Sequence, residues 1–511
     1  MTGRSLRAHL SWPFSLDAVW LLAPALALSA IALLSPVRPH DYFWALVQGR
    51  TTWQLGSVAE HNAFLYTIPE TALFVNQAWL GQLFLYGGYG LGGHTFNLVL
   101  LALLLAASLS IAMDGALQRG ARPTHVALVA LVSLPLLALG SGVRTQMFAY
   151  PCFVLLLRFV LLEARRLAPR PLAVVLVATL LWANAHGSFV LAPAIILARA
   201  AVGVWTAPRE TRARTAREHG LELALVLAAT CLNPRGPLVY GYALGLPLAM
   251  GVLEDTDVNE WRALSPLSPF GMAVIAGMLA GMLLGVRRRG RVNLAALGVF
   301  LACSALCLVS QRFLAWAALS AVLVLPVLTR SEREVPAGER GGVAGLNAAL
   351  IGAMVLGVLA SLPGAPLFQR FAPCAHLPYP DARVLGKETP LRLAERLARE
   401  GAAGRIFHDQ AAGGLLEWTL ARSGPKAVAF VDQRFEIVPR EIWAQYFTVA
   451  SAGPGWEALL DRYGIGTLLI DQERQHRLVN AVERDREWRL VARELSYRLY
   501  VRSPAKPPGH G

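Results

Sequence analysis

The sequence has little charge and few cysteines. Only 16% of its 511 residues are Asp, Glu, Lys or Arg, whereas 55% are hydrophobic. This composition excludes a disordered chain and is a poor fit to an ordinary cytosolic enzyme. The five cysteines include no Cys-x-x-Cys pair, so neither a disulfide framework nor a zinc site is predicted. The composition is instead typical of an integral membrane protein.

Recognisable cofactor motifs are also missing. The chain contains no P-loop, no nucleophile elbow and no glycine-rich loop in a dinucleotide-binding context, so we predict no cofactor, although a divalent metal stays open. The net charge of +14 suggests a nucleic-acid partner at first sight. However, basic residues exceed acidic ones by 26 to 16 in residues 1–362 and by only 21 to 17 in residues 363–511. The excess therefore lies mainly between apolar segments, where it indicates topology and contact with lipid headgroups, and no nucleic acid is predicted.

Apolar segments of spanning or near-spanning length divide the first 362 residues, and we interpret them as eleven transmembrane helices. They lie at about 17–36, 94–113, 124–141, 146–163, 171–183, 188–205, 220–232, 267–286, 292–309, 313–329 and 343–362. With the N-terminus inside, the inner connections hold 18 arginines and the outer ones six. This bias supports the orientation and predicts that residues 363–511 lie outside, in a multi-pass membrane protein.

Two of the predicted spans are short, because 13 helical residues reach only about 20 Å across a hydrocarbon core of about 30 Å. They end in Asn184-Ala185-His186-Gly187 and in Asn233-Pro234-Arg235-Gly236. Breaks of this kind favour a polar vestibule at the outer face, with Asn184 and His186 binding a substrate. The alternative interpretation is that both breaks are surface turns and that His186 caps a helix.

The predicted outer loop 37–93 carries the leading catalytic candidate. It holds eleven of the 44 aromatic residues of the chain, a density typical of a membrane interface or of a surface on which sugars stack. Asp41 follows the first span closely, and Tyr42-Phe43-Trp44 would hold it against the membrane. A carboxylate in this place suits a general base, although a solvated loop aspartate is the alternative. Arg50 is a further candidate for binding substrate.

Two outer arginines are candidates for binding a lipid phosphate. Arg144 and Arg312 each begin or closely precede a span, where a guanidinium group can hold a phosphate through two hydrogen bonds. An alternative explains both arginines equally well, namely that each side chain extends to the lipid headgroups. The acidic loop of Glu254, Asp255, Asp257 and Glu260 offers oxygen ligands to a divalent ion, but a solvated run of charge is the simpler interpretation.

A proline-rich linker after Ser361 leads into a segment of mixed polarity. Strands are predicted at 405–407, 427–431, 467–470, 488–492 and 497–501, with helices around 391–397, 440–449, 456–463 and 474–485. The prediction is therefore a mainly α membrane protein, residues 1–362, followed by a small extracytoplasmic α/β domain, residues 363–511.

Several short motifs carry a resemblance to a known group. They are His40-Asp41-Tyr42-Phe43-Trp44, Gln48-Gly49-Arg50, Trp79-Leu80, Arg144-Thr145-Gln146, Trp182-Ala183-Asn184-Ala185-His186-Gly187, Asn233-Pro234-Arg235-Gly236, Arg312-Phe313, Gly413-Gly414-Leu415-Leu416 and Phe430-Val431-Asp432-Gln433-Arg434. Over nearly the whole chain, the sequence resembles bacterial polytopic proteins related to GT-C glycosyltransferases, which use polyprenyl-phosphate-linked sugars. It departs from that pattern at Ala45, Asn62 and Ala78, where polar or acidic residues are expected.

The resemblance implies an inverting sugar transfer. A loop aspartate, here Asp41, would deprotonate the acceptor, a glycan or a lipid, while basic residues hold the phosphate of the lipid-linked donor. Two other classes stay open. A transporter or flippase of lipid-linked sugar would also need a vestibule, but the halves of the chain show no matching broken helices. A membrane assembly or scaffold protein would fit the missing polar residues.

Overall fold

The computed structural model describes residues 5–10, 14–162, 169–250, 262–288, 293–329 and 343–503. These residues form two compact units. Unit 1 comprises residues 1–35, 98–244 and 253–371, and unit 2 comprises residues 36–97, 245–252 and 372–511. The region after the first predicted span thus groups with the C-terminal region. The predicted boundary at residue 362 and the outer location of residues 363–511 stay predictions.

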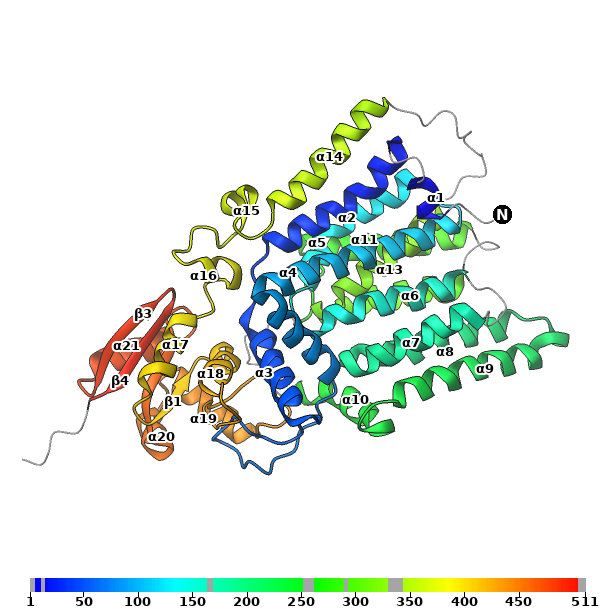
Figure 1. Cartoon of the computed structure of the whole chain (residues 1–511). Helices are drawn as coiled ribbons and strands as arrows, with labels where there is room; N and C mark the ends of the chain where they lie inside the picture. The colour runs from blue at the N-terminus through cyan, green and yellow to red at the C-terminus, as the bar shows by residue number, and fades with distance from the viewer. Residues whose placement is uncertain are drawn as a thin grey trace, which may run out of the picture. The chain divides into compact units, whose positions relative to one another are not determined.

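Unit 1 is a bundle of helices that lie side by side in Figure 1. Its helices are α1 (Leu6–Leu10), α2 (Leu16–Leu34), the second half of α4 (Trp79–Gln118), α5 (Pro123–Gly140), α6 (Ala149–Leu162), α7 (Pro169–Ala185), α8 (Leu191–Thr206), α9 (Arg209–Cys231), the first part of α10 (Val239–Met250), α11 (Pro269–Arg287), α12 (Leu294–Cys307), α13 (Leu314–Leu328), α14 (Ala344–Ala360) and α15 (Pro366–Phe371).

Among the described residues, seven helices are long and apolar enough to cross a membrane, or eight if the bent pair α9 and α10 is one span. Three shorter apolar helices, α7, α12 and α14, complete the set. Every predicted span overlaps a helix, so the chain is a multi-pass membrane protein with a mainly α fold, and the count of eleven stays a prediction. A bend of 92° separates α9 from the helical segment that begins at Gly236.

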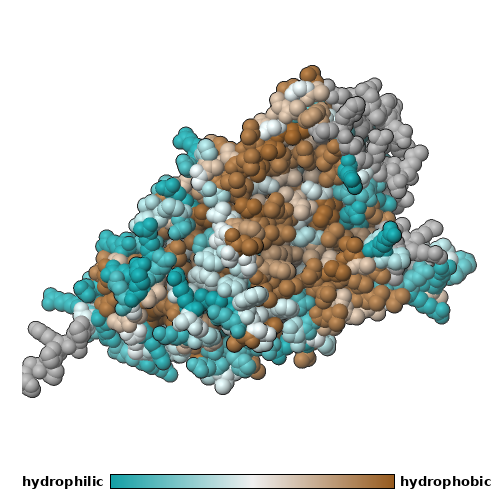
Figure 2. All heavy atoms as spheres, in the orientation of Figure 1, coloured by the Kyte–Doolittle hydropathy of each residue, from teal (hydrophilic) through white to brown (hydrophobic). Residues whose placement is uncertain are grey.

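The outer surface of the bundle is apolar. Figure 2 shows hydrophobic residues over much of its visible face, and exposed side chains include Leu103, Val132, Val177, Leu279 and Leu356. Because a soluble protein rarely exposes so large an apolar surface, these residues indicate contact with lipid.

Unit 2 combines a small sheet with helices. Its elements are α3 (Pro39–Leu55), the first half of α4, α16 (Pro380–Leu385), α17 (Leu391–Glu400), β1 (Arg405–His408), η7 (Gln410–Ala412), α18 (Gly413–Leu420), α19 (Arg440–Ala450), α20 (Trp456–Tyr463), β2 (Ile465–Asp471), α21 (His476–Arg484), β3 (Trp488–Glu494) and β4 (Tyr497–Arg502). The strand order is β1-β2-β4-β3, with β1 and β2 parallel and the other neighbours antiparallel.

Four of the five predicted strands and all four predicted C-terminal helices are confirmed. The strand predicted at 427–431 is wrong. Ala429 makes a single bridge to Leu65, and Val428 and Ala429 both donate to the carbonyl of Phe64. Residues 428–431 are buried, but their partner is a short loop, so no ladder continues from the bridge. Within the predicted outer loop 37–93, the structure has α3 and the start of α4.

Candidate functional site

Asp41 lies in the first turn of α3, where a carboxylate is favoured by the helix dipole. Pro39 begins the helix, since proline fits the first helical position without losing a hydrogen bond. The next two residues, Tyr42 and Phe43, are fully buried, whereas Asp41 is half-buried. The helix therefore presents Asp41 at the edge of a packed region.

Helix α3 packs against η7 and α18 in unit 2. A Cβ atom on Gly414 would lie 2.7 Å from the backbone nitrogen of Trp44, and one on Gly413 would lie 2.5 Å from the carbonyl oxygen of Val431. No side chain fits at either distance, which explains the Gly413-Gly414 pair of the motif. The close approach then places the end of α18 beside Arg50.

Arg50 is buried and caps the last turn of α18. Its guanidinium donates to the carbonyl oxygens of Trp418 at 3.1 Å, Glu417 at 3.3 Å and Ala421 at 3.1 Å, and lies 4.5 Å from the ring centre of Trp418. The guanidinium thus supplies donors at the C-terminal turn of the helix, where intrahelical N–H donors run out. These bonds explain Arg50 structurally, and its predicted contact with a substrate stays a prediction.

The motif Asp432-Gln433-Arg434 forms a buried ion pair next to Glu417. The Nε of Arg434 donates to the Asp432 carboxylate at 2.8 Å, and the Arg434 side chain is 1% exposed. Burial raises the pKa of Glu417 well above its usual value, and the nearby Asp432 carboxylate adds to this effect. Both effects favour the protonated form of Glu417 beside the Asp432 carboxylate.

Asn62, where the resemblance expects an acid, is a structural residue. Its Nδ2 donates to the carbonyls of Leu65, Ile68 and Pro69, and its Oδ1 accepts from the Leu65 N–H. A carboxylate cannot make the donor contacts. The asparagine at this position, in place of the expected acid, thus supplies an amide group that closes a turn.

A second buried network lies at the carboxyl ends of the parallel strands β1 and β2. Asp409 follows β1 and accepts from Arg474 at 2.9 Å and from the Tyr497 hydroxyl at 3.0 Å, while Asp471 at the end of β2 lies 3.0 Å from Arg474. Burial raises the pKa of Asp409, against the opposing effects of Arg474 and, more weakly, of His40.

In unit 1, an aromatic cluster marks one end of the bundle. The ring of Trp316 lies 5.1 Å from Tyr150, 5.1 Å from Phe153 and 5.8 Å from Trp182, stacked on the last. The Tyr150 hydroxyl donates to the carbonyl of Gly140, at the end of α5. These contacts tie the end of α5 and the starts of α6 and α13 to the end of α7.

The predicted phosphate ligands lie at this end. Arg144 is between α5 and the short helix η1 (Thr145–Phe148), and Arg312 is in η5 (Gln311–Phe313) directly before α13. A Cβ atom on Gly140 would lie 2.8 Å from the nitrogen of Ala315, so the end of α5 and the start of α13 are in close contact. Arg144 and Arg312 therefore occupy the same end of unit 1, and phosphate binding stays a prediction.

The two predicted helix breaks are neighbours. Asn184 donates through Nδ2 to the carbonyl of Leu232, just before the second break, and to that of Leu180. His186 is extended, and its Nδ1 accepts from the N–H of Ser188 at the start of η2 (Gly187–Val190). Helix capping by His186 is thus present, and substrate binding by Asn184 and His186 stays a prediction.

The structure brings four of the six predicted residues, Arg144, Arg312, Asn184 and His186, to one end of unit 1. Asp41 and Arg50 belong to unit 2, and the approach of Asp41 to the arginines stays a prediction. Across the described ranges, no group of three or more His, Cys, Asp or Glu side chains is arranged to hold a metal. The acidic loop with Glu254 lies outside the described residues.

Sequence reasoning missed the interior networks around Asp409 and Arg434. The motif Phe430-Val431-Asp432-Gln433-Arg434 did contribute to the resemblance, but its chemistry was not assigned. The sequence does carry one signal of a buried ion pair, namely an Asp two residues before an Arg at an apolar run.

No protein-family model matches the sequence, and no curated protein matches it either. Solved structures do match. The arabinofuranosyltransferase AftD from Mycobacteria is similar with a TM-score of 0.52 and 17% identity, over 94% of this chain and 40% of that protein. The oligosaccharyltransferase AglB from Archaeoglobus fulgidus, solved with an inhibitory peptide and a dolichol-phosphate, has a TM-score of 0.54 and 11% identity, over 96% and 75%. ArnT from Cupriavidus metallidurans, bound to undecaprenyl phosphate, has a TM-score of 0.51 and 12% identity, over 97% and 99%.

These similarities define the class of fold. The chain has the fold of GT-C glycosyltransferases, as the resemblance predicted, with a small four-stranded sheet in its C-terminal region. It spans less than half the length of AftD and almost the full length of ArnT.

Proposed function

We propose that this protein is a membrane glycosyltransferase that moves a sugar from a polyprenyl-phosphate carrier to an extracytoplasmic acceptor. The observation that carries the proposal is the shared fold over 97% of this chain and 99% of ArnT, a protein solved with undecaprenyl phosphate. A match along both chains includes the helical bundle and the region around Asp41. The proposed location is a bacterial inner membrane, with the N-terminus inside and residues 363–511 outside.

In the proposed reaction, Asp41 is the general base. Its carboxylate accepts the proton of an acceptor hydroxyl, and the hydroxyl oxygen attacks the anomeric carbon of the donor sugar. The bond from that carbon to the phosphate oxygen breaks, so the configuration inverts and the polyprenyl phosphate leaves. Arg144 and Arg312 balance the charge that develops on the phosphate.

Two features of unit 2 support Asp41 in this role. Its half-buried position leaves part of the carboxylate accessible, and the buried Tyr42 and Phe43 fix the turn of α3 that carries it. A general base must approach its proton to about 3 Å, which a fixed helical turn favours.

Replacement of Asp41 by Asn tests the proposal. The side chain keeps its size and loses its basicity, so the protein should still insert and fold while transfer falls by about 10²–10⁴-fold. Incorporation of labelled sugar from a panel of polyprenyl-phosphate sugars into membrane glycans is the measurement, with Glu60→Gln as the matched control.

Equal incorporation by wild type and Asp41→Asn would remove Asp41 as the base. Absence of incorporation by wild type from every donor would reject the glycosyltransferase and leave a scaffold or a transporter of lipid-linked sugar.

A further inference from the structure

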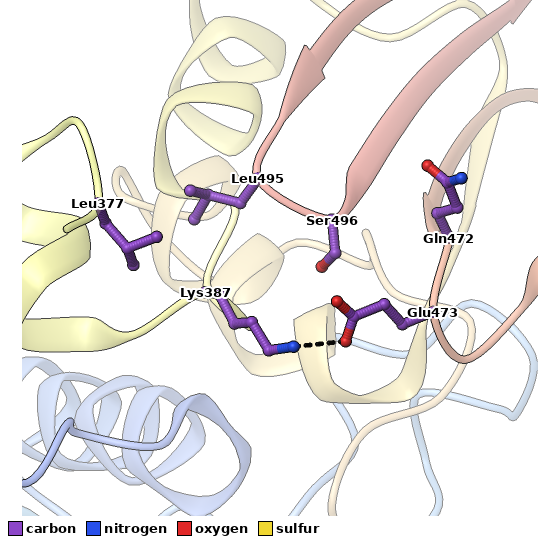
Figure 3. Close-up of a pocket in the computed structure, with 6 residues that line it drawn as sticks. All are labelled: Leu377, Lys387, Gln472, Glu473, Leu495 and Ser496. Atoms are coloured by element: carbon purple, nitrogen blue, oxygen red, sulfur yellow. Dashed lines mark hydrogen bonds and ion pairs between the residues drawn. The ribbon is translucent and has the colours of Figure 1, made fainter. Parts of the chain in front are cut away.

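Unit 2 contains a cavity that no part of the proposed chemistry has used. It has a volume of about 480 Å³, within the range of small-molecule sites. Its lining is Leu377, Lys387, Gln472, Glu473, Leu495 and Ser496. Figure 3 shows the two leucines on one side and the polar side chains on the other, with an ion pair joining Lys387 to Glu473.

Three segments that line this cavity are anchored by the buried network behind it. Lys387, Glu473 and Ser496 line the cavity, and the residue that follows each of them, Glu388, Arg474 or Tyr497, belongs to the network. Arg474 and Tyr497 both contact Asp409, and the Tyr497 hydroxyl also donates to the carbonyl of Glu388 at 3.2 Å.

This arrangement fixes the cavity walls. Three of the six lining residues are each one peptide bond away from a member of this network, so the backbone around them is held before any ligand binds. Prior organisation of this kind lowers the entropic cost of binding. The cavity also lies next to the carboxyl end of β2, the edge at which open α/β sheets commonly bind ligands.

The same wall continues to the segment that carries Asp41. A Cβ atom on Gly386, next to Lys387, would lie 3.3 Å from the Cβ of Pro36, and the N–H of Val37 donates to the carbonyl of Val384 at 2.8 Å. Four residues after Val37 comes Asp41. Within unit 2, one wall of the cavity therefore packs directly on the chain that leads into α3.

The chemistry of the lining selects a neutral ligand. Lys387 and Glu473 pair at 2.6 Å, so an anion would have to displace Glu473 and a cation would have to displace Lys387. Both side chains are more than half exposed. The pair, together with Gln472 and Ser496, offers both donors and acceptors to hydroxyl groups.

The apolar side of the cavity also suits a sugar. Leu377 and Leu495 can cover the C–H face of a pyranose ring. Leu495 is held with a φ of 53°, a conformation uncommon for a leucine, at the turn between β3 and β4. Strained residues of this kind cluster at ligand sites.

We propose that this cavity binds a neutral, hydroxyl-rich carbohydrate, and that this carbohydrate is the acceptor of the transfer reaction. The second part rests on the proposed function. The first part concerns the cavity alone, and each part has its own measurement.

Lysine acylation reports on the cavity directly. Lys387 is one of only three lysines in the chain, and the exposed Lys426 serves as an internal control. The full-length protein in lipid nanodiscs is treated with an N-hydroxysuccinimide ester, with and without maltose, cellobiose, N,N′-diacetylchitobiose or sn-glycerol 1-phosphate. At about ten times its Kd, a bound disaccharide should slow the acylation of Lys387 about tenfold and leave Lys426 unchanged.

Two substitutions make the test specific. Glu473→Gln removes one cavity carboxylate and should weaken the protection by the disaccharide. Glu400→Gln removes an equally exposed glutamate from the pair with Arg396, away from the cavity lining, and should leave protection unchanged. Protection by sn-glycerol 1-phosphate alone, protection by no probe, or equal slowing at Lys426 would overturn the carbohydrate site.

The two proposals fail in different ways. If a disaccharide protects Lys387 but wild type transfers no sugar, the cavity is a carbohydrate site and its role as acceptor site is rejected with the proposed function. If wild type transfers sugar but no probe protects Lys387, the proposed function stands and the carbohydrate site is rejected.

Discussion

Glu417 and Asp432 are neighbouring carboxyl groups inside unit 2, although 15 positions separate them in the sequence. Both side chains are fully buried, and Arg434 binds Asp432 from the other side. Across the part of the chain that the structure describes, neither Glu417 oxygen receives a hydrogen bond from a protein N–H or O–H. A proton on Glu417 resolves this, because it supplies the hydrogen bond to Asp432 and leaves one negative charge to balance Arg434.

This pairing predicts different outcomes for two substitutions. Glu417→Gln still offers a donor to Asp432, so it should change the stability of unit 2 by less than about 1 kcal/mol. The double variant Glu417→Gln/Asp432→Asn removes both carboxyl groups next to Arg434, and breaking a buried pair of this type costs about 3–5 kcal/mol. Hydrogen exchange of α18 measures both values. A large loss in Glu417→Gln alone would show that Glu417 is ionised.

His408 predicts a loss of stability in mild acid. It is fully buried at the end of β1, and its Nε2 accepts from the N–H of Phe430 at 2.9 Å while Nδ1 donates to the carbonyl of Asp409. Burial lowers the pKa of His408 from 6.5 to about 4. The folded pKa lies below the unfolded one, so this contribution to stability is complete above pH 6.5 and is lost as the pH falls towards 4.

Between pH 8 and pH 5 the His408 contribution to the free energy of unfolding should fall by about 2 kcal/mol. Glu417 acts in the opposite direction, because its raised pKa favours the folded state as the pH falls. His408→Gln therefore serves as the reference, since an amide keeps a donor and an acceptor but does not titrate in this range. Identical pH slopes for wild type and His408→Gln, measured by hydrogen exchange of β1, would contradict the assignment.

The helical part of the fold was predictable because its signals are local. Runs of apolar residues mark α2, α5, α6, α8, α11 and α13, and the strands β2, β3 and β4 follow their alternating or continuous apolar patterns. The short elements of unit 2 depend on distant partners. Ala427 to Val431 has the composition of a strand, yet what it meets is the loop at Leu65, about 360 residues earlier. No local pattern contains that information.

The residues of the candidate site fall into the same two groups, those that local sequence patterns locate and those that depend on distant partners. Arg144, Arg312, Asn184 and His186 stand at helix ends that could be located from apolar runs, so their common end of the bundle was within reach of the sequence. The capping role of Arg50 could not be predicted, because its three acceptors are backbone carbonyls at the end of α18. Any sequence that forms this helix supplies such carbonyls.

Arg50 allows a structural role to be separated from contact with a substrate. Arg50→Lys keeps the charge, but an ammonium group cannot reproduce the planar set of donors that reaches three carbonyls. Unit 2 should therefore lose about 2–3 kcal/mol, since bonds from a charged donor are worth about 1.5–3 kcal/mol. Hydrogen exchange of the last turn of α18 is the measurement. Arg422→Lys is the control, because Arg422 is exposed and lies just after the end of α18. Unchanged exchange together with weaker donor binding would instead support the substrate role.

The remaining prediction concerns Arg144 and Arg312, which the close contact of Gly140 with Ala315 brings to one end of unit 1 although 168 positions separate them. If both hold one phosphate, each single substitution to Gln should weaken the binding of undecaprenyl phosphate by about tenfold, because a charge-assisted hydrogen bond contributes about 1.5–3 kcal/mol. The effects should not add, since the two guanidinium groups share one ligand. A double-mutant cycle, measured by native mass spectrometry in detergent, tests this, with Arg38, at the N-terminus of α3, replaced by Gln as control. Strictly additive effects, or equal losses in the control, would place the two arginines at separate lipid headgroups and remove the shared phosphate site from the proposed mechanism.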